Sequence, residues 1–255
     1  AASLLFRIIG ILSQFVLRTF FIYLLGKQYT GISGLFTDIL NVLSLMEMGL
    51  DGSMIYALYK PLEEQNLSRV SALMNFFKKA FTLIGVTVLC LGLGCIPFLD
   101  HIVTGVPDIK EDIRLIFIMY VVTSASSYFF IYRSILFRAD QKSRIISNWS
   151  TLIQIAECGA EILFLMITRQ FFAYLIIHFA ATVGKNILLS WKAKKMYPQY
   201  FMDKDAKLKP QETKILLRDI LCLTAYSLSG VIINSTDSIF ISTFTGIVQV
   251  AIVGN

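Results

Sequence analysis

Long apolar segments alternate with short polar connections along the whole chain of 255 residues. At a rise of about 1.5 Å per residue, roughly 20 apolar residues in a helix span the hydrocarbon core of a bilayer. No stretch shows the alternation of polar and apolar residues that is typical of membrane barrel strands. The pattern therefore predicts an all-α integral membrane protein with about seven transmembrane helices. These cover residues 3–25, 32–58, 80–103, 113–136, 147–168, 171–191 and 220–245.

Composition favours the same class, with 56% hydrophobic residues, 16% charged residues and a mean hydropathy of +0.68. A soluble domain has about a quarter of its residues charged. The net charge of +6 does not indicate nucleic acid as a partner, because in a membrane protein the location of the positive residues matters more than their sum. The connections 59–79, 133–146 and 191–218 hold sixteen lysines and arginines, against four in the intervening connections. The positive-inside rule then predicts a multi-pass protein with a cytoplasmic N-terminus.

The longest polar stretch, residues 192–219, predicts a basic cytoplasmic linker. We expect it to join an N-terminal six-helix lobe, residues 1–191, to the first helix of a second lobe, residues 220–255. The chain starts without methionine and ends inside an apolar unit, so we expect it to be a fragment of a longer protein. Residues 60–79 are interpreted as a short interfacial amphipathic helix after Pro61.

Positive charges inside the apolar segments provide the main functional signal. Arg7 and Arg18 are eleven residues apart, which places them within roughly 20° of one helix face. Lys185 also lies well inside an apolar segment. A charged residue near the centre of a membrane helix costs roughly 2.5–3.5 kcal/mol and usually faces the bundle interior or a wet cavity. These three residues therefore predict a cationic cavity that binds an anionic substrate.

Carboxylates inside the segments are candidates for ion coupling or gating. Glu47 lies near Asp51 on one helix face, where the alternatives are an ion pair with an arginine of the first helix and a gating role. Glu157 and Glu161 form an i,i+4 pair of like charges that do not both ionise readily in a low dielectric. They favour either proton coupling or pairing with Lys185 or an arginine. Asp237 needs a basic partner across the bundle.

Motifs for catalysis and for cofactor binding do not appear. The sequence contains no P-loop and no serine in a nucleophile-elbow pattern. The two histidines, His101 and His178, are too far apart to indicate a metal site, and His178 is interpreted as a hydrogen-bonded helix contact. None of the four cysteines forms a CxxC pair, so buried thiols are expected. We predict no catalytic residue, no metal and no cofactor, and hence no enzyme.

Several segments resemble, in one order, the bacterial polysaccharide-unit flippases of the multidrug/oligosaccharidyl-lipid/polysaccharide (MATE-like) exporter superfamily. The resemblance spans most of the chain. It is carried by Arg18–Phe36, Leu43–Leu50, Leu58–Glu64, Arg138–Lys142 and Ser235–Ser242.

This resemblance implies two six-helix lobes that face each other, of which this chain would hold the first lobe and the opening helix of the second. It implies flipping of undecaprenyl-pyrophosphate-linked oligosaccharides across the bacterial cytoplasmic membrane, and it maps the family's first-helix arginine onto Arg18 and its second-helix glutamate onto Glu47. Implied partners are the lipid-linked oligosaccharide, membrane lipids, a sodium ion or proton, and polysaccharide assembly enzymes. The alternatives are a multidrug or cation exporter of the same fold and a non-transporting scaffold for glycan assembly.

Overall fold

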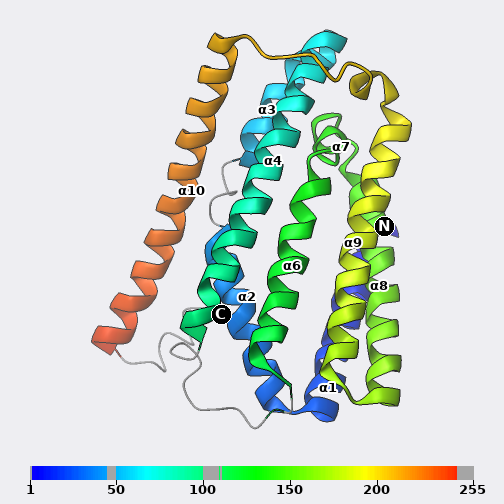
Figure 1. Cartoon of the computed structure of the whole chain (residues 1–255), viewed down its shortest axis with the longest axis vertical. Helices are drawn as coiled ribbons and strands as arrows, with labels where there is room; N and C mark the ends of the chain where they lie inside the picture. The colour runs from blue at the N-terminus through cyan, green and yellow to red at the C-terminus, as the bar shows by residue number, and fades with distance from the viewer. Residues whose placement is uncertain (1, 45–49, 100–108, 110, 246–255) are drawn as a thin grey trace.

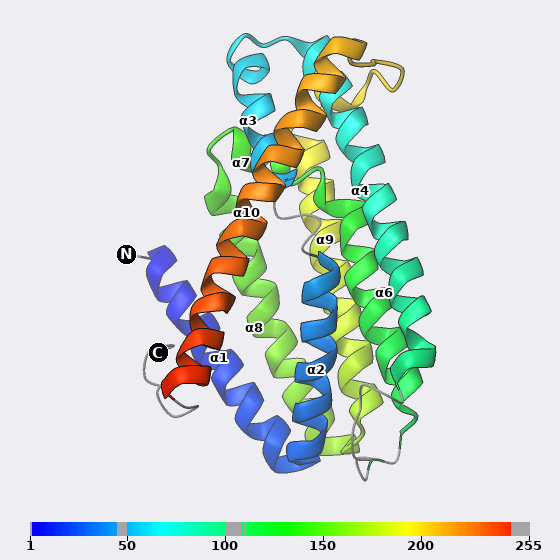
Figure 2. The ribbon, with the colours of Figure 1, turned by 90° about the vertical axis from the view of Figure 1, so that its left-hand side faces the viewer.

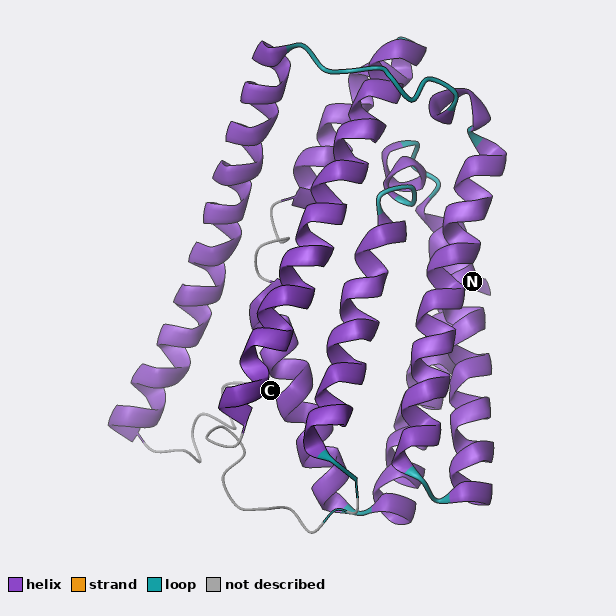
Figure 3. Cartoon of the chain, in the orientation of Figure 1, coloured by secondary structure: helices purple, strands orange, loops and turns teal. Residues whose placement is uncertain are grey.

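The computed structural model describes residues 2–44, 50–99, 109 and 111–245, and the side chains of these residues except 2–7, 27, 42–44 and 230–245. Within this part of the chain the secondary structure consists of nine α-helices and two short 3-10 helices, with no strand (Figure 3). The α-helices are α1 (Ala2–Leu25), α2 (Lys27–Ser44), α3 (Leu50–Glu63), α4 (Leu67–Cys95), α6 (Ile113–Ile131), α7 (Ile135–Ala139), α8 (Ser143–Thr168), α9 (Phe171–Met196) and α10 (Pro210–Thr245). The 3-10 helices are η2 (Ile96–Phe98) and η3 (Pro198–Phe201).

The long helices run side by side along the length of the molecule (Figure 1). Helix α6 packs between α4 and α9, α8 packs against α9, and α1 lies along α8. Helices α1 and α2 lie in front of α8 and α9 in Figure 2, and α10 packs on α3. The α3–α4 turn, α7 and the α9–α10 connection all lie toward one end of the bundle. The three connections that are rich in lysine and arginine therefore meet at the same end.

Five helices in the described part of the chain are long and apolar enough to cross a membrane, judged by length and composition. They cover Ile8–Leu25, Leu67–Phe98, Ile113–Ile131, Ser143–Thr168 and Phe171–Met196. The expected segment 32–58 is divided between α2 and α3, with residues 45–49 outside the described part. The expected segment 220–245 forms the C-terminal part of α10, and only residues 197–209 separate α9 from α10.

The interpretation of residues 60–79 as a separate interfacial helix is wrong. The side chain of Asn66 accepts a hydrogen bond from the Arg69 backbone nitrogen at 3.0 Å, and α4 runs unbroken from Leu67 to Cys95. Val70, Leu73, Met74 and Phe77 of this stretch are buried in a core formed with α3, α7 and η3. An amphipathic pattern is the same in sequence whether its apolar face meets lipid or protein, so the pattern alone did not distinguish the two.

Glycines permit one turn and one close helix contact in the bundle. Gly26 has a φ of +97° between α1 and α2, and its backbone nitrogen donates to the Ile22 carbonyl at 3.0 Å, which ends α1 as a left-handed glycine cap. Gly92 of α4 lies so close to α6 that an added Cβ would come within 2.6 Å of the Val121 side chain. Small residues at such positions let membrane helices approach each other closely.

Polar contacts fix α7 to its neighbours at the basic end of the bundle. Arg138 of α7 forms an ion pair with Asp51 of α3. Asp140 receives a hydrogen bond from the Tyr197 hydroxyl at 2.5 Å and pairs with Lys142 at 2.6 Å. Burial acts to raise the pKa of Asp140, but the contacts with Lys142 and Tyr197 outweigh it, so that its pKa lies below the ordinary value.

Candidate functional site

A polar chamber of about 650 Å³ opens between α1, α2, α6, α8 and α9. Its wall combines charged, amide, hydroxyl and aromatic side chains, an unusual lining for the interior of a bundle of apolar helices. The polar residues of the wall are Gln14, Arg18, Thr30, Ser33, Thr37, Asp38, Tyr120, Ser150, Gln154, Glu157, Glu161, Tyr174, His178, Thr182 and Lys185.

Two cations line this chamber. Arg18 comes from α1 and is exposed, while Lys185 comes from α9 and is half-buried. Within the described residues, neither side chain has a carboxylate at ion-pair distance. A guanidinium and an ammonium that lack carboxylate partners and face one polar space are suited to hold a phosphate.

The carboxylates of α8 lie against the histidine of α9. His178 Nδ1 is 2.8 Å from Glu157 Oε1 and 3.5 Å from Glu161 Oε1. Glu161 has only 1% of its surface exposed, and no donor in the described part of the chain hydrogen-bonds to its Oε1. Of the two alternatives, proton coupling and pairing with Lys185 or an arginine, the second would require a contact different from the one observed, which is with His178.

Three aromatic residues, Phe21, Phe171 and Tyr174, form an aromatic cluster next to His178. Tyr174, one turn before His178 on α9, stacks on its ring at a centroid distance of 6.0 Å and an interplanar angle of 11°. Phe171 stacks on Tyr174 from the other side, at 5.8 Å. Phe21 of α1 meets Tyr174 edge-to-face at 5.0 Å. This packing fixes the imidazole relative to the two glutamates and ties α1 to α9 below the chamber.

The chamber carries carboxylates as well as cations. Asp38, Glu157 and Glu161 provide three carboxylates, whereas Arg18 and Lys185 provide two cations. Asp38 is exposed and Glu161 is buried, so the carboxylates occur both at the open side and in the depth of the chamber. The chamber thus offers separate subsites for a negative and for a positive group.

The structure brings together four of the predicted site residues and leaves three outside the described side chains. Arg18, Glu157, Glu161 and Lys185 share the chamber. The backbone of Arg7 lies in α1 and that of Asp237 in α10, but their side chains are not described, and Glu47 lies in the undescribed segment 45–49. The roles of all seven residues remain predictions.

Sequence reasoning did not assign Asp38, Ser33 or Tyr120 to a site. Asp38 and Ser33 lie on α2 and Tyr120 lies on α6, and all three line the chamber. The signal available for α2 was its polar face, with hydroxyl residues at Thr30, Ser33 and Thr37 in helical spacing. Tyr120 carried no such signal, because a tyrosine in an apolar helix is usually a packing residue.

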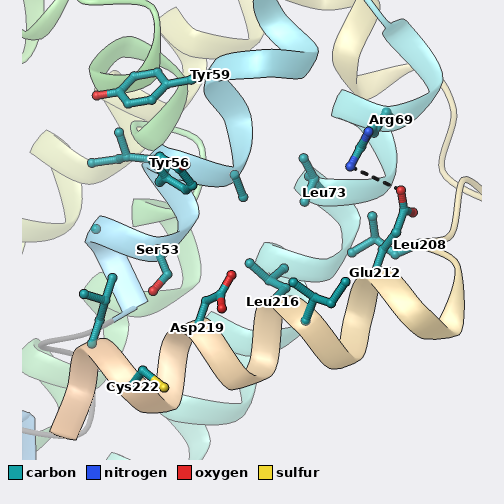
Figure 4. Close-up of a pocket in the computed structure, with 15 residues that line it drawn as sticks. Ser53, Tyr56, Tyr59, Arg69, Leu73, Leu208, Glu212, Leu216, Asp219 and Cys222 are labelled. Atoms are coloured by element: carbon teal, nitrogen blue, oxygen red, sulfur yellow. Dashed lines mark ion pairs between the residues drawn. The ribbon is translucent and has the colours of Figure 1, made fainter. Parts of the chain in front are cut away.

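A second cavity, of about 970 Å³, lies between α3, α4 and α10 (Figure 4). Its wall is mainly aliphatic, with Leu73, Leu216 and several other apolar residues. Its one arginine, Arg69, is held by Glu212 across the cavity at 3.3 Å. Because this cation is already paired, the larger cavity is less suited to an anion than the chamber.

A bundle of membrane-length helices around a polar chamber defines this chain as an all-helical membrane protein. Comparison with solved structures supports this fold. One match is the crystal structure of a MATE protein carrying a point mutation, with a TM-score of 0.64 and 17% identity over 97% of this chain and 57% of that one. Another is a multidrug/oligosaccharidyl-lipid/polysaccharide (MOP) superfamily transporter from Pyrococcus furiosus, with a TM-score of 0.58 and 15% identity over 98% of this chain and 57% of that one.

A family model described as "Polysaccharide biosynthesis protein" matches residues 1–254. The chain therefore belongs to the polysaccharide biosynthesis protein family. The resemblance drawn from the sequence is confirmed, as is the expected all-helical membrane fold, which corresponds to about half of a MATE fold. No curated protein matches. The chain spans 57% of the length of the two solved structures, whose likeness establishes the fold.

Proposed function

We propose that the full-length protein is a secondary transporter that flips undecaprenyl-pyrophosphate-linked oligosaccharide units across the bacterial cytoplasmic membrane by alternating access. The units would serve cell-surface polysaccharide synthesis. The observation that carries this proposal is the pair of cations, Arg18 and Lys185, that line one chamber without carboxylate partners in the described part of the chain. Membership of the polysaccharide biosynthesis family supports the substrate class.

The chamber suggests how the substrate is held. The pyrophosphate would lie between Arg18 and Lys185, since charge-assisted hydrogen bonds to phosphate are among the strongest that side chains form. The amides and hydroxyls that line the remaining wall, such as Gln154 and Thr182, match the hydroxyl groups of a sugar. The division into a first lobe, residues 1–191, and a second lobe that starts at residue 220 belongs to the same proposal, as does the cytoplasmic N-terminus.

Ion coupling belongs to the proposal as well, with a sodium ion or a proton as the driving ion. Glu157 and Glu161 are coupling candidates that line the chamber, so a cation bound to them changes the charge that the substrate meets. The other two coupling candidates are Glu47 and Asp237.

A second candidate function is export of organic cations. The excess of carboxylates over fixed cations in the chamber favours it, because Asp38, Glu157 and Glu161 attract a positive ligand. The two functions differ in the sign of the charge that must bind.

Reconstitution of the full-length protein separates the two functions. We expect proteoliposomes to translocate a pyrophosphate-linked oligosaccharide lipid, faster when a sodium or a proton gradient is imposed, and not to accumulate a lipophilic cation. Each gradient is imposed separately, and liposomes without protein serve as the control. Accumulation of the cation together with an unmoved lipid-linked oligosaccharide would overturn the proposal in favour of the second function.

A further inference from the structure

The wall of the chamber contains two neighbouring carboxylates, which is unfavourable for a site that binds an anion. Glu157 and Glu161 lie one helical turn apart, and both face the space that Arg18 and Lys185 line. A pyrophosphate in this chamber would be repelled by both carboxylates. Where both carboxylates are ionised, their charge needs a cation besides these two fixed ones.

The histidine balances only part of this charge. The contact of 2.8 Å with His178 Nδ1 accounts for Glu157. Glu161 is buried, with an exposed fraction of 1%, and among the described residues its Oε1 accepts no hydrogen bond although it faces the same nitrogen. A buried carboxylate oxygen without a donor is costly, which indicates a ligand at this point.

The three side chains have the geometry of a metal site. One ligand atom from each of Glu157, Glu161 and His178 lies within 4.8 Å of the others. Two atoms that coordinate one ion at about 2.1 Å lie roughly 3–4 Å apart, so the distances of 2.8 and 3.5 Å from His178 Nδ1 need only small adjustments. The stacked ring of Tyr174 holds the imidazole in place, as groups around metal ligands commonly do.

We propose that Glu157, Glu161 and His178 bind a divalent cation, and that this ion bridges them to the phosphate that Arg18 and Lys185 hold. Two carboxylates and one imidazole suit an ion of the Mn²⁺ type, which accepts both oxygen and nitrogen ligands. Divalent ions in phosphate-binding sites commonly combine one or two protein carboxylates with oxygens of the ligand.

The bridge accounts for the mixed charge of the chamber. With a divalent cation bound to the triad of Glu157, Glu161 and His178, the phosphate has this ion on one side and the two fixed cations on the other. The carboxylates then attract the phosphate through the ion instead of repelling it. The phosphate half of this inference rests on the proposed function, whereas the metal half stands on the three side chains alone. In this arrangement Glu157 and Glu161 bind the divalent ion, and the remaining coupling candidates are Glu47 and Asp237.

The metal half of the proposal is tested by titrating the purified full-length protein with Mn²⁺. Electron paramagnetic resonance measures the concentration of the free ion at each step. We expect Glu161→Gln and His178→Gln each to remove one Mn²⁺ site, with an affinity loss of at least about a hundredfold, and Glu63→Gln to leave the titration unchanged. Glu63 is an exposed glutamate at the end of α3. Mn²⁺ should raise the unfolding temperature of the wild type and of Glu63→Gln but not of the two triad variants, which separates lost binding from misfolding.

Unchanged Mn²⁺ stoichiometry in a folded Glu161→Gln variant would overturn the metal site. An equal loss of Mn²⁺ binding in Asp38→Asn would also overturn the metal site, because binding would then depend on the overall negative charge of the chamber. A rise in the unfolding temperature with Na⁺ but not with Mn²⁺ would show that the site binds a monovalent ion instead of a divalent one.

The bridging half is tested by binding of a short-chain prenyl pyrophosphate with Mn²⁺ or with EDTA. We expect EDTA to weaken binding at least about tenfold in the wild type and not in Glu161→Gln. The same effect of EDTA in both proteins would overturn the bridge. Triad-dependent Mn²⁺ binding without translocation of a pyrophosphate-linked lipid would overturn the proposed function and leave the metal site standing.

Discussion

Replacing both Arg18 and Lys185 with glutamine is expected to lower translocation of a pyrophosphate-linked oligosaccharide lipid by at least about a hundredfold. Each single replacement should cost about tenfold, because a charge-assisted hydrogen bond to phosphate contributes about 1.5–3 kcal/mol. Glutamine keeps the polarity of these side chains and removes their charge. The measurement is the initial rate of translocation in proteoliposomes with equal amounts of full-length protein.

The matched control for this double variant is Arg144→Gln with Lys194→Gln. Both control residues are exposed, and they lie outside the chamber, near the start of α8 and the end of α9. They should therefore retain the wild-type rate within about a factor of two. A chamber variant that translocates the lipid as fast as this control would remove the two cations from the mechanism.

Replacing Phe171 with alanine is expected to lower the free energy of unfolding by about 3 kcal/mol. Phe171 is fully buried and touches three aromatic rings, with centroid distances of 5.8 Å to Phe21, 5.1 Å to Tyr29 and 5.8 Å to Tyr174. Removing the ring leaves a cavity beneath the chamber and frees Tyr174, on which His178 stacks. The value is the lower end of the range for soluble proteins, since lipid replaces water as the alternative environment.

Equilibrium unfolding in micelles measures this loss, and Phe164→Ala provides the matched control. Phe164 lies on α8 with 50% of its surface exposed, so its loss leaves no enclosed cavity and should cost less than about 1 kcal/mol. An equal loss in the free energy of unfolding for the two variants would show that the aromatic cluster does not stabilise the bundle.

The helices themselves could be predicted because membrane-length apolar segments have few alternative structures. Their ends could be predicted less well. Helix α4 starts at Leu67 instead of residue 80, because its first turns pack on protein instead of lipid. The segment 32–58 has one continuous apolar pattern, and its described residues belong to α2 and α3.

The residues of the candidate site that could be predicted are those indicated by the pattern of a single helix. The spacing of Glu157 and Glu161, and the position of Lys185 inside an apolar segment, were visible in the sequence, and the structure places all three on one chamber. Contacts between helices were not predictable in this way. The sequence does not indicate His178 as a ligand, because only the packing of α8 on α9 brings it to the two glutamates. For the same reason, the sequence does not indicate that Asp51 pairs with Arg138 of α7.

The most direct test of the central claim is the affinity of the full-length protein for an oligosaccharide lipid with and without its pyrophosphate. Our account predicts that the pyrophosphate form binds at least about tenfold more tightly than the same lipid and sugar joined without phosphate. This difference should disappear when Arg18 and Lys185 are both glutamine. Equal affinity of the wild type for the two lipids would contradict the claim that the chamber recognises an anion.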